Sequence, residues 1–572
     1  MKTQMLIKRA VLLLTLSGMA AFNTSADTLT WSAGASGTWD ATSVSWVDGV
    51  PSPTAWVDGN AAVFSQAAGS TTSVVIDGNV SVSGTWAFGT PGDWGDDWTV
   101  RADFAFSGGT VTFSAPDSRI QLNRVNEAHV SAHLITADNQ TFAFRALGYN
   151  VNNDLYLTGG GRSETTFEYG GRQFGNSTWW LGFWDEDISV MFNAGTYVMR
   201  QLTTFSTHAS YVGRGNTDAV AVNLLTLEML QGAIIMDNPN AVFTQAVWHN
   251  IAQSKIGQSN NNGAFEVRQG VASFEGGVAV MNGNGNGAGL GLITVSGGTL
   301  NVNPDSIFNS GTNGILLGHM DNNSGKTDVD GKAMLSLSGG AVNTHGIYFG
   351  GSNEPRSGRW AATSTAALLV SGGTLTLGAG GIQKDSIYAM GENLITLSGG
   401  VVRARDSFAI DAALAVTLSD ANGGVTFDTN GSQITINGEV NGAGGLAKAG
   451  NGTLLLGGAN TYAGDTIVSA GALQLDNVNA LGGVADLSVW TGAMVNLNYS
   501  GTAVIDSLLL DGVTISNLVI GQGYNHTELN TALGAVIFSG AGLLSVSAIP
   551  EPSALTLLLT GAALLAVMRR RR

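Results

Sequence analysis

Two histidines lie four residues apart, at His129 and His133, in the segment Ala-His-Val-Ser-Ala-His. On one strand their side chains would share a face, and imidazole is a common metal ligand. No Glu follows in the spacing of a zinc-protease helix, so two exposed strand histidines are the favoured interpretation. The chain contains no Cys, which excludes thiolate zinc sites, Cys nucleophiles and disulfides.

Acidic clusters could bind calcium or act as paired catalytic carboxylates. The two densest runs are Asp93, Asp96 and Asp97, and Asp185, Glu186 and Asp187. A third run, beginning at Asp321, resembles a calcium-binding loop. Its twelfth position is Lys332, however, where an EF-hand needs Glu. Because Asp-rich turns are usually solvated surface features, we assign no catalytic, cofactor-binding or metal-ligating residue.

Three tryptophans, Trp179, Trp180 and Trp184, lie close to Asp185 and Arg172. Aromatic rings beside polar groups can stack on sugar rings, which makes these three residues candidates for glycan contact. Aromatic side chains also bury large areas in cores, and we favour that interpretation.

The segment Ser-Gly-Gly recurs with apolar residues in constant phase around it. Its copies begin at Ser107, Ser296, Ser338, Ser371 and Ser398. In the second copy, Ile293 and Val295 precede the Ser, and Leu300 and Val302 follow it. Period two on both sides of a Gly pair predicts two short strands, each with one buried face.

Two geometries satisfy this phase. A Gly-Gly hairpin would place Val295 opposite Leu300 on one face. Alternatively, Gly-Gly marks the corner of a β-solenoid, where equivalent residues such as Val295 and Leu337 stack across rungs. We favour the solenoid, because no helical pattern of convincing length lies between the copies; an array of two-sheet sandwiches is the other possibility.

A second repeat spans residues 438–475 and consists of short strands separated by Gly, Asn and Asp turns. Leu454 and Leu456 alternate inward, as do Leu473 and Leu475, and Asn460 is suited to a ladder or a turn. The order of Gly, Thr, Leu, Asn, Tyr and Gly closely resembles the autotransporter-associated β-strand repeat of passenger domains. That resemblance implies a right-handed parallel β-helix.

The N-terminal body contains Trp31, Trp39 and Trp46, which we interpret as an aromatic cap over the first open rung. Between Leu487 and Val546 the sequence predicts short strands alone, which would close the other end. The repeats run almost to the C-terminal tail, so we expect no outer-membrane pore of the chain's own and dependence on other export machinery.

The first residues read as a secretory signal. Lys2, Lys8 and Arg9 precede an apolar run over 10–21, and small residues lead to a cleavage site between Ala26 and Asp27.

The last residues form a second signal, in which an apolar run over 554–568 could span a thin membrane. Pro550, Glu551 and Pro552 precede that run, and the chain ends with four arginines. The arginines are Arg569, Arg570, Arg571 and Arg572. This order resembles the PEP-CTERM sorting signal, and the resemblance implies recognition by an exosortase-type membrane enzyme and removal of the tail.

The composition excludes several classes of protein. The 80 Gly among 572 residues are too few for collagen, and 44% hydrophobic with 12% charged residues argues against disorder. The net charge of −17 argues against nucleic-acid binding. Seven of the 25 basic residues and one of the 42 acidic residues lie in the two end signals, so the body between them carries −23.

The sequence therefore predicts an all-β fold: a right-handed parallel β-helix (β-solenoid) with an N-terminal signal peptide and a single C-terminal apolar helix. The predicted segments are a signal peptide (1–26), a capping β segment (27–115), a β-rich segment (116–276), the Ser-Gly-Gly solenoid (277–437), the autotransporter-type repeat with a C-terminal β segment (438–548) and the sorting signal with its transmembrane helix (549–572).

We expect a non-enzymatic, exported bacterial protein of the cell surface or extracellular matrix with a structural or adhesive role. Its expected partners are the secretion machinery, an exosortase-type enzyme, exopolysaccharide and, through the C-terminal helix before processing, the membrane. No cofactor and no nucleic acid are expected. The alternative is a β-helix polysaccharide lyase or glycoside hydrolase, because fold does not decide function.

Overall fold

The structure is a computed structural model that describes most of the chain between Asp27 and Ser547. The described ranges are 27–48, 52–65, 70–89, 103–114, 119–123, 127–130, 132–136, 143–147, 152–157, 187–192, 195–206, 209–212, 220–245, 249–255, 262–284, 289–303, 314–320, 330–351, 360–482 and 485–547. Over these ranges no helix has the length and apolarity needed to cross a membrane.

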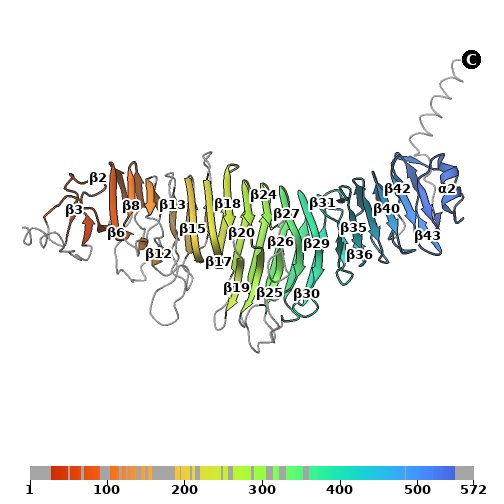
Figure 1. Cartoon of the computed structure of the whole chain (residues 1–572), viewed down its shortest axis with the longest axis horizontal. Coiled ribbons are helices and arrows are strands. Elements are labelled where there is room, and N and C mark those ends of the chain that lie inside the picture. Colours follow the sequence, from red (N-terminus) through yellow and green to blue (C-terminus); the bar gives the residue numbers. More distant parts are fainter. Residues whose placement is uncertain are drawn as a thin grey trace, which may run out of the picture.

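Short strands follow one another along the long axis of the molecule (Figure 1). Successive turns of the chain, which we call coils, lie on one another. Almost all of the described strands pair in parallel with the equivalent strand of the next coil. Three parallel stacks result. The prediction of an all-β fold is confirmed for the described residues, with one short helix added; the hand of the coiling and the domain boundaries stay predictions.

The first stack runs from the N-terminal end to residue 442. Its strands are, in order, β2 (Ser36–Trp39), β5 (Thr71–Ile76), β7 (Asp103–Ser107), β10 (Glu127–Val130), β13 (Asn152–Leu157), β14 (Asp187–Phe192), β16 (Ala209–Val212), the end of β17 (Val220–Met236), β20 (Asn262–Val267), β23 (Leu290–Val295), β26 (Lys332–Leu337), β28 (Thr365–Val370), β30 (Glu392–Leu397), β33 (Val416–Leu418) and β36 (Val440–Gly442).

The second stack carries the strand that follows each corner. Its strands are β15 (Gly195–Ser206), the start of β17, β18 (Ala241–Gln245), β21 (Val271–Phe274), β24 (Thr299–Val302), the starts of β27 (Ala341–Phe349) and β29 (Thr374–Lys384), β31 (Val401–Ala404), β34 (Val425–Asp428), β37 (Leu446–Ala449), β39 (Thr466–Val468), β41 (Leu487–Val489) and β44 (Leu508–Leu510).

The third stack completes each coil. Its strands are a central part of β17, β19 (His249–Lys255), β22 (Val278–Asn284), β25 (Ile315–Met320), the ends of β27 and β29, β32 (Phe408–Ile410), β35 (Gln433–Ile436), β38 (Thr453–Leu456), β40 (Ala472–Leu475), β42 (Met494–Leu497) and β46 (Phe538–Gly540).

The Ser-Gly-Gly segments are corners between the first and second stacks. Val295 pairs with Leu337 of the next coil, and Leu300 pairs with Val342. The strands on either side of Gly297-Gly298 therefore belong to different stacks, and the solenoid alternative is confirmed over the hairpin. The apolar side chains of these columns are almost wholly buried, and each buried Leu or Ile contributes about 1.5–3 kcal/mol by leaving water.

The second glycine of each pair is required by backbone stacking. Gly340 has φ +67°, and a Cβ there would run into the carbonyl oxygen of Gly298 in the preceding coil. Gly373 has φ +69° and meets Gly340 in the same way. Neighbouring corners thus approach more closely than any side chain allows.

The N-terminal end is filled with aromatic rings. Trp31, Trp39 and Trp46 are buried, and the Trp39 ring lies 5.0 Å from Trp56 and 5.4 Å from Trp86 in edge-to-face contacts. Such contacts add to the area that the rings bury. The remaining strands of this end are β1 (Thr28–Trp31), β3 (Trp46–Val47), β4 (Asn60–Phe64), β6 (Asn79–Phe88), β8 (Thr110–Phe113), β9 (Arg119–Asn123), β11 (His133–Thr136) and β12 (Ala143–Leu147).

The C-terminal end is closed by two further strand pairs and a helix. β45 (Val513–Thr514) pairs antiparallel with β44, and β43 (Thr502–Ile505) pairs with β47 (Leu543–Val546). Helix α2 (His526–Leu533) supplies Asn530, whose Oδ1 accepts from the backbone N–H groups of Ile537 and Phe538. The sequence analysis expected strands alone here and was wrong: Asn525 and Glu528 form a capping box that begins α2.

We predict that Gly340→Ala destabilises the chain more than Gly431→Ala. Gly431 also has a positive φ, +84°, but a Cβ there would meet nothing within 4 Å. We expect Gly431→Ala to cost only the left-handed strain of about 1 kcal/mol, and Gly340→Ala to cost roughly 2 kcal/mol more. Urea unfolding followed by circular dichroism measures both, and equal losses would contradict the stacking account.

Candidate functional site in the C-terminal coils

Most of the candidate residues for signal cleavage, sorting and glycan contact lie outside the described residues. These are Ala26, Trp179, Trp180, Trp184, Pro550, Glu551, Pro552, Arg569, Arg570, Arg571 and Arg572. The acidic residues Asp93, Asp96, Asp97, Asp185 and Glu186 also lie outside them, whereas Asp187 begins β14. Asp27, on the other side of the expected cleavage site, is described: its carbonyl oxygen accepts from the N–H of Ala61, 2.9 Å away. The roles expected for the signal-cleavage, sorting and glycan-contact residues stay predictions.

The two histidines do not share a strand face. His129 lies in β10 of the first stack, whereas His133 lies in β11, which pairs with β8 in a different sheet. The expectation of a common face was wrong because the chain turns a corner between them. Among the described residues no group of three or more His, Asp or Glu side chains is arranged to hold a metal ion.

A buried lysine interrupts the apolar column of the second stack. Lys448 pairs with Phe427 of the preceding coil and with Val468 of the next, so it occupies an inward position. Its Nζ donates to the carbonyl oxygens of Ala449, Gly450 and Ala470, at 3.0, 2.8 and 2.9 Å. The ammonium group therefore satisfies corner carbonyls of two successive coils.

The environment of Lys448 disfavours its charge. Burial lowers the pKa of Lys448 to about 8, although the Asp428 carboxylate of the preceding coil opposes that shift. Near neutral pH most molecules still carry the ammonium form, which is the better hydrogen-bond donor.

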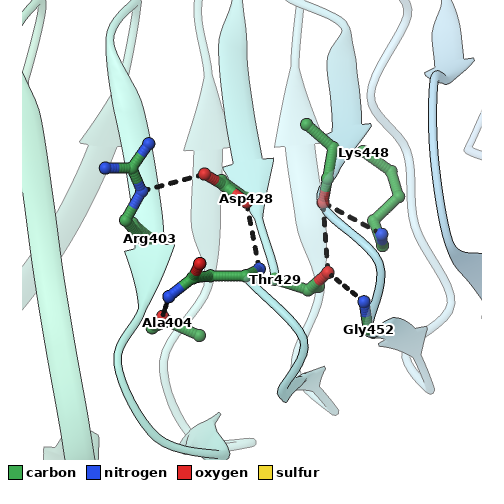
Figure 2. Close-up of polar contacts among 8 residues, drawn as sticks. Arg403, Ala404, Asp428, Thr429, Lys448 and Gly452 are labelled. Atoms are coloured by element: carbon green, nitrogen blue, oxygen red, sulfur yellow. Dashed lines mark hydrogen bonds and ion pairs between the residues drawn. The ribbon is translucent and has the colours of Figure 1, made fainter.

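Polar side chains extend this bracing to the preceding coils (Figure 2). The Arg403 Nε lies 2.8 Å from the Asp428 Oδ2, which joins two neighbouring coils. The Thr429 hydroxyl donates to the carbonyl of Ala449 and accepts from the N–H of Gly452. The corners that follow β34 and β37 are thus joined by side chains where strand pairing ends.

Asn460 ties together three coils from within. Its Oδ1 accepts from the N–H of Val440 at 2.9 Å, and its Nδ2 donates to the carbonyl of Ala480 at 2.6 Å. The side chain is buried, so both bonds are shielded from water. The sequence analysis expected Asn460 in a ladder of stacked side chains or in a turn; instead its side chain bonds backbone groups of Val440 and Ala480 on the two neighbouring coils.

Carboxylates gather on the corner that precedes the second stack. The N–H of Asp486 donates to the Oδ1 of Asp465, 3.1 Å away, and Asp506 lies on the next coil. Burial, followed by the charges of Asp465 and Asp506, raises the pKa of Asp486, and hydrogen bonds from Ser507 oppose the shift. Stacking thus brings like charges together.

Lys448 was missed as a structural residue in the sequence analysis. The signal was present, because Lys448 falls in the phase of Leu446, two residues from it, where an apolar side chain is expected. The aspartate cluster carried no such signal, since its members are 20 to 21 residues apart and meet only when the coil length is known.

Comparison with known proteins finds two similarities. Residues 446–475, which form β37 to β40, match the passenger-associated transport repeat. The autotransporter adhesin BmaC of Brucella suis biovar 1 (strain 1330) is 31% identical over 223 residues, which are 38% of this chain and 6% of the adhesin. No solved structure matches.

The matched segment spans a small part of the adhesin's length. A passenger-type repeat and likeness to an autotransporter adhesin nevertheless agree on location, and they indicate a protein that is exported to the cell surface.

We predict that Lys448→Met lowers the free energy of unfolding by about 1–3 kcal/mol, because the carbonyl groups of Gly450 and Ala470 lose the ammonium donor. The matched control, Lys332→Met, changes an exposed lysine at the start of β26 and should stay within about 0.5 kcal/mol. A stabilising effect of Lys448→Met, as seen where buried charges are replaced by apolar groups, would contradict the bracing role.

We predict that Asp486→Asn raises the midpoint of thermal unfolding at pH 7. A carboxyl group whose pKa is raised by folding destabilises the fold when ionised, so the gain should vanish below about pH 3, where Asp is protonated in both states. Asp420→Asn, at an exposed turn, is the control. The same gain at pH 3 and pH 7 would show that charge is not its cause.

Proposed function

We propose that this chain is a structural and adhesive protein of the bacterial cell surface or extracellular matrix, built as a right-handed β-helix. The passenger-type repeat at residues 446–475 carries the proposal, because its four strands belong to two successive coils inside the longer stacks. Likeness to an autotransporter adhesin supports the adhesive role. The same similarity supports a non-enzymatic role.

The proposal extends to sorting. The segment Pro550-Glu551-Pro552 with the arginines at 569–572 supports recognition by an exosortase-type enzyme after export, with membrane contact through the apolar run until processing. Association with exopolysaccharide is the proposed outcome of that sorting. The signal ending at Ala26 would direct the chain to the general secretion machinery.

A polysaccharide hydrolase or lyase is the second candidate function, and the carboxylate cluster at Asp465, Asp486 and Asp506 favours it. A raised pKa suits a general acid, and glycoside hydrolysis needs a second carboxylate nearby. Incubation of the purified chain with diverse polysaccharides decides the matter: release of reducing or unsaturated ends that Asp486→Asn abolishes would favour this function over the first.

We predict that an epitope-tagged chain increases attachment of the cells that display it and is retained on their surface or matrix. Removal of residues 549–572 should move the chain to another fraction, because the sorting signal is lost. A full-length chain with Ser553→Ala controls for expression. Equal fractionation of the two lengths would refute the role of the tail, and unchanged attachment of displaying cells would refute the adhesive role.

A further inference from the structure

One tryptophan of the described residues differs from the rest. Trp490 is 49% exposed, whereas the others are at most 7% exposed. Those buried residues are Trp31, Trp39, Trp46, Trp56, Trp86 and Trp360. The exposed half of the Trp490 side chain gains no free energy from burial, so packing in the core does not account for a Trp at this position.

Trp490 follows β41 on the outer side of the second stack. The backbone N–H of Trp490 donates to the carbonyl of Val468, 2.9 Å away, which extends the parallel pairing of β41 with β39. The same register places Ser469 of the preceding coil and Asp511 of the next coil on either side of Trp490. Each neighbour is about 4.8 Å away along the stack.

The turn that carries Trp490 is held from the next coil. The carboxylate of Asp511 accepts from the N–H of Thr491 at 2.8 Å and from its hydroxyl at 2.6 Å. The carbonyl of Trp490 accepts from the N–H of Ala493 at 2.9 Å. The two bonds from Thr491 lower the pKa of Asp511. All three bonds fix the backbone that carries the ring, so little backbone entropy remains to be lost on binding.

Exposed apolar side chains also occur on the coils adjacent to Trp490. Ile467 of the preceding coil, opposite Ser488, is 39% exposed, and Val513 of β45, opposite Leu510 of the next coil, is 67% exposed. An ionised carboxylate has about four acceptor positions, so Asp511 can accept further hydrogen bonds beyond those from Thr491. An aromatic face beside a hydroxyl and a carboxylate suits a sugar ring, whose C–H face is apolar and whose edge carries hydroxyl donors.

The charge of the chain selects among sugars. The net charge is −17, and Asp511 adds a local negative charge, so polyanionic glycans are repelled. We propose that Trp490 is a stacking surface for a pyranose ring of a neutral polysaccharide, with the carboxylate of Asp511 accepting from the sugar hydroxyl groups. This inference rests on the proposed adhesive function and names its partner.

Affinity electrophoresis of the full chain in gels containing dextran, laminarin, hydroxyethyl cellulose or alginate tests the proposal. We expect retardation by at least one neutral polymer and none by alginate. Trp490→Ala should weaken that binding about tenfold and Trp490→Phe by less, since a smaller ring still stacks. Val536→Ala, at another exposed apolar residue, is the matched control.

The proposal would be overturned if no neutral polymer retarded the chain, or if Trp490→Ala were retarded as much as the natural chain. It would also be overturned if sedimentation showed a changed oligomeric state of Trp490→Ala, because Trp490 would then lie in a contact between copies of the chain. A measurement of how well cells that display the chain attach distinguishes failure of the adhesive function from failure of the Trp490 site. Attachment of the cells that is unaffected by Trp490→Ala would support the adhesive function and reject this site. Polysaccharide binding through Trp490 without attachment of the cells would support the site and reject the adhesive function.

Discussion

Parallel, in-register pairing between successive coils is the constraint on which the rest of the structure depends. Each strand donates and accepts backbone hydrogen bonds on both edges, so the coils must lie about 4.8 Å apart at every point of the stack. Corners have to follow the same spacing. Gly340 stacks on Gly298 because only a glycine at positive φ lets two corner backbones come so close.

The same constraint explains the polar residues of the interior. Where strand pairing ends at a corner, carbonyl groups face inward without a strand partner, and an unsatisfied buried carbonyl is costly. Lys448 donates to carbonyl groups of its own coil and of the next coil, and the Asn460 amide donates to the carbonyl of Ala480 on the next coil. A repeat that carries such residues is held by its neighbours, with no need of disulfides in a chain that lacks Cys.

The sequence predicts the strands, which show as apolar residues at every second position, and the corners, which show as paired glycines. The phase around Ser296 and Ser338 anticipates which residues stack, and the structure pairs Val295 with Leu337 accordingly. It does not predict what depends on coil length. His129 and His133 are close in the chain but lie in different sheets, whereas Asp465 and Asp486 are far apart in the chain and in contact.

Stacking also decides what the outer surface can present. A residue that points outward is flanked by the equivalent residues of the two adjacent coils, so its partners are fixed by register rather than by a local loop. Trp490 is exposed and yet held, because Asp511 of the next coil binds the turn beneath it. A rigid exposed ring loses little entropy when it binds. Recognition at the surface would therefore depend on the same hydrogen-bonded register that stabilises the fold, and loosening of the last coils would weaken both together.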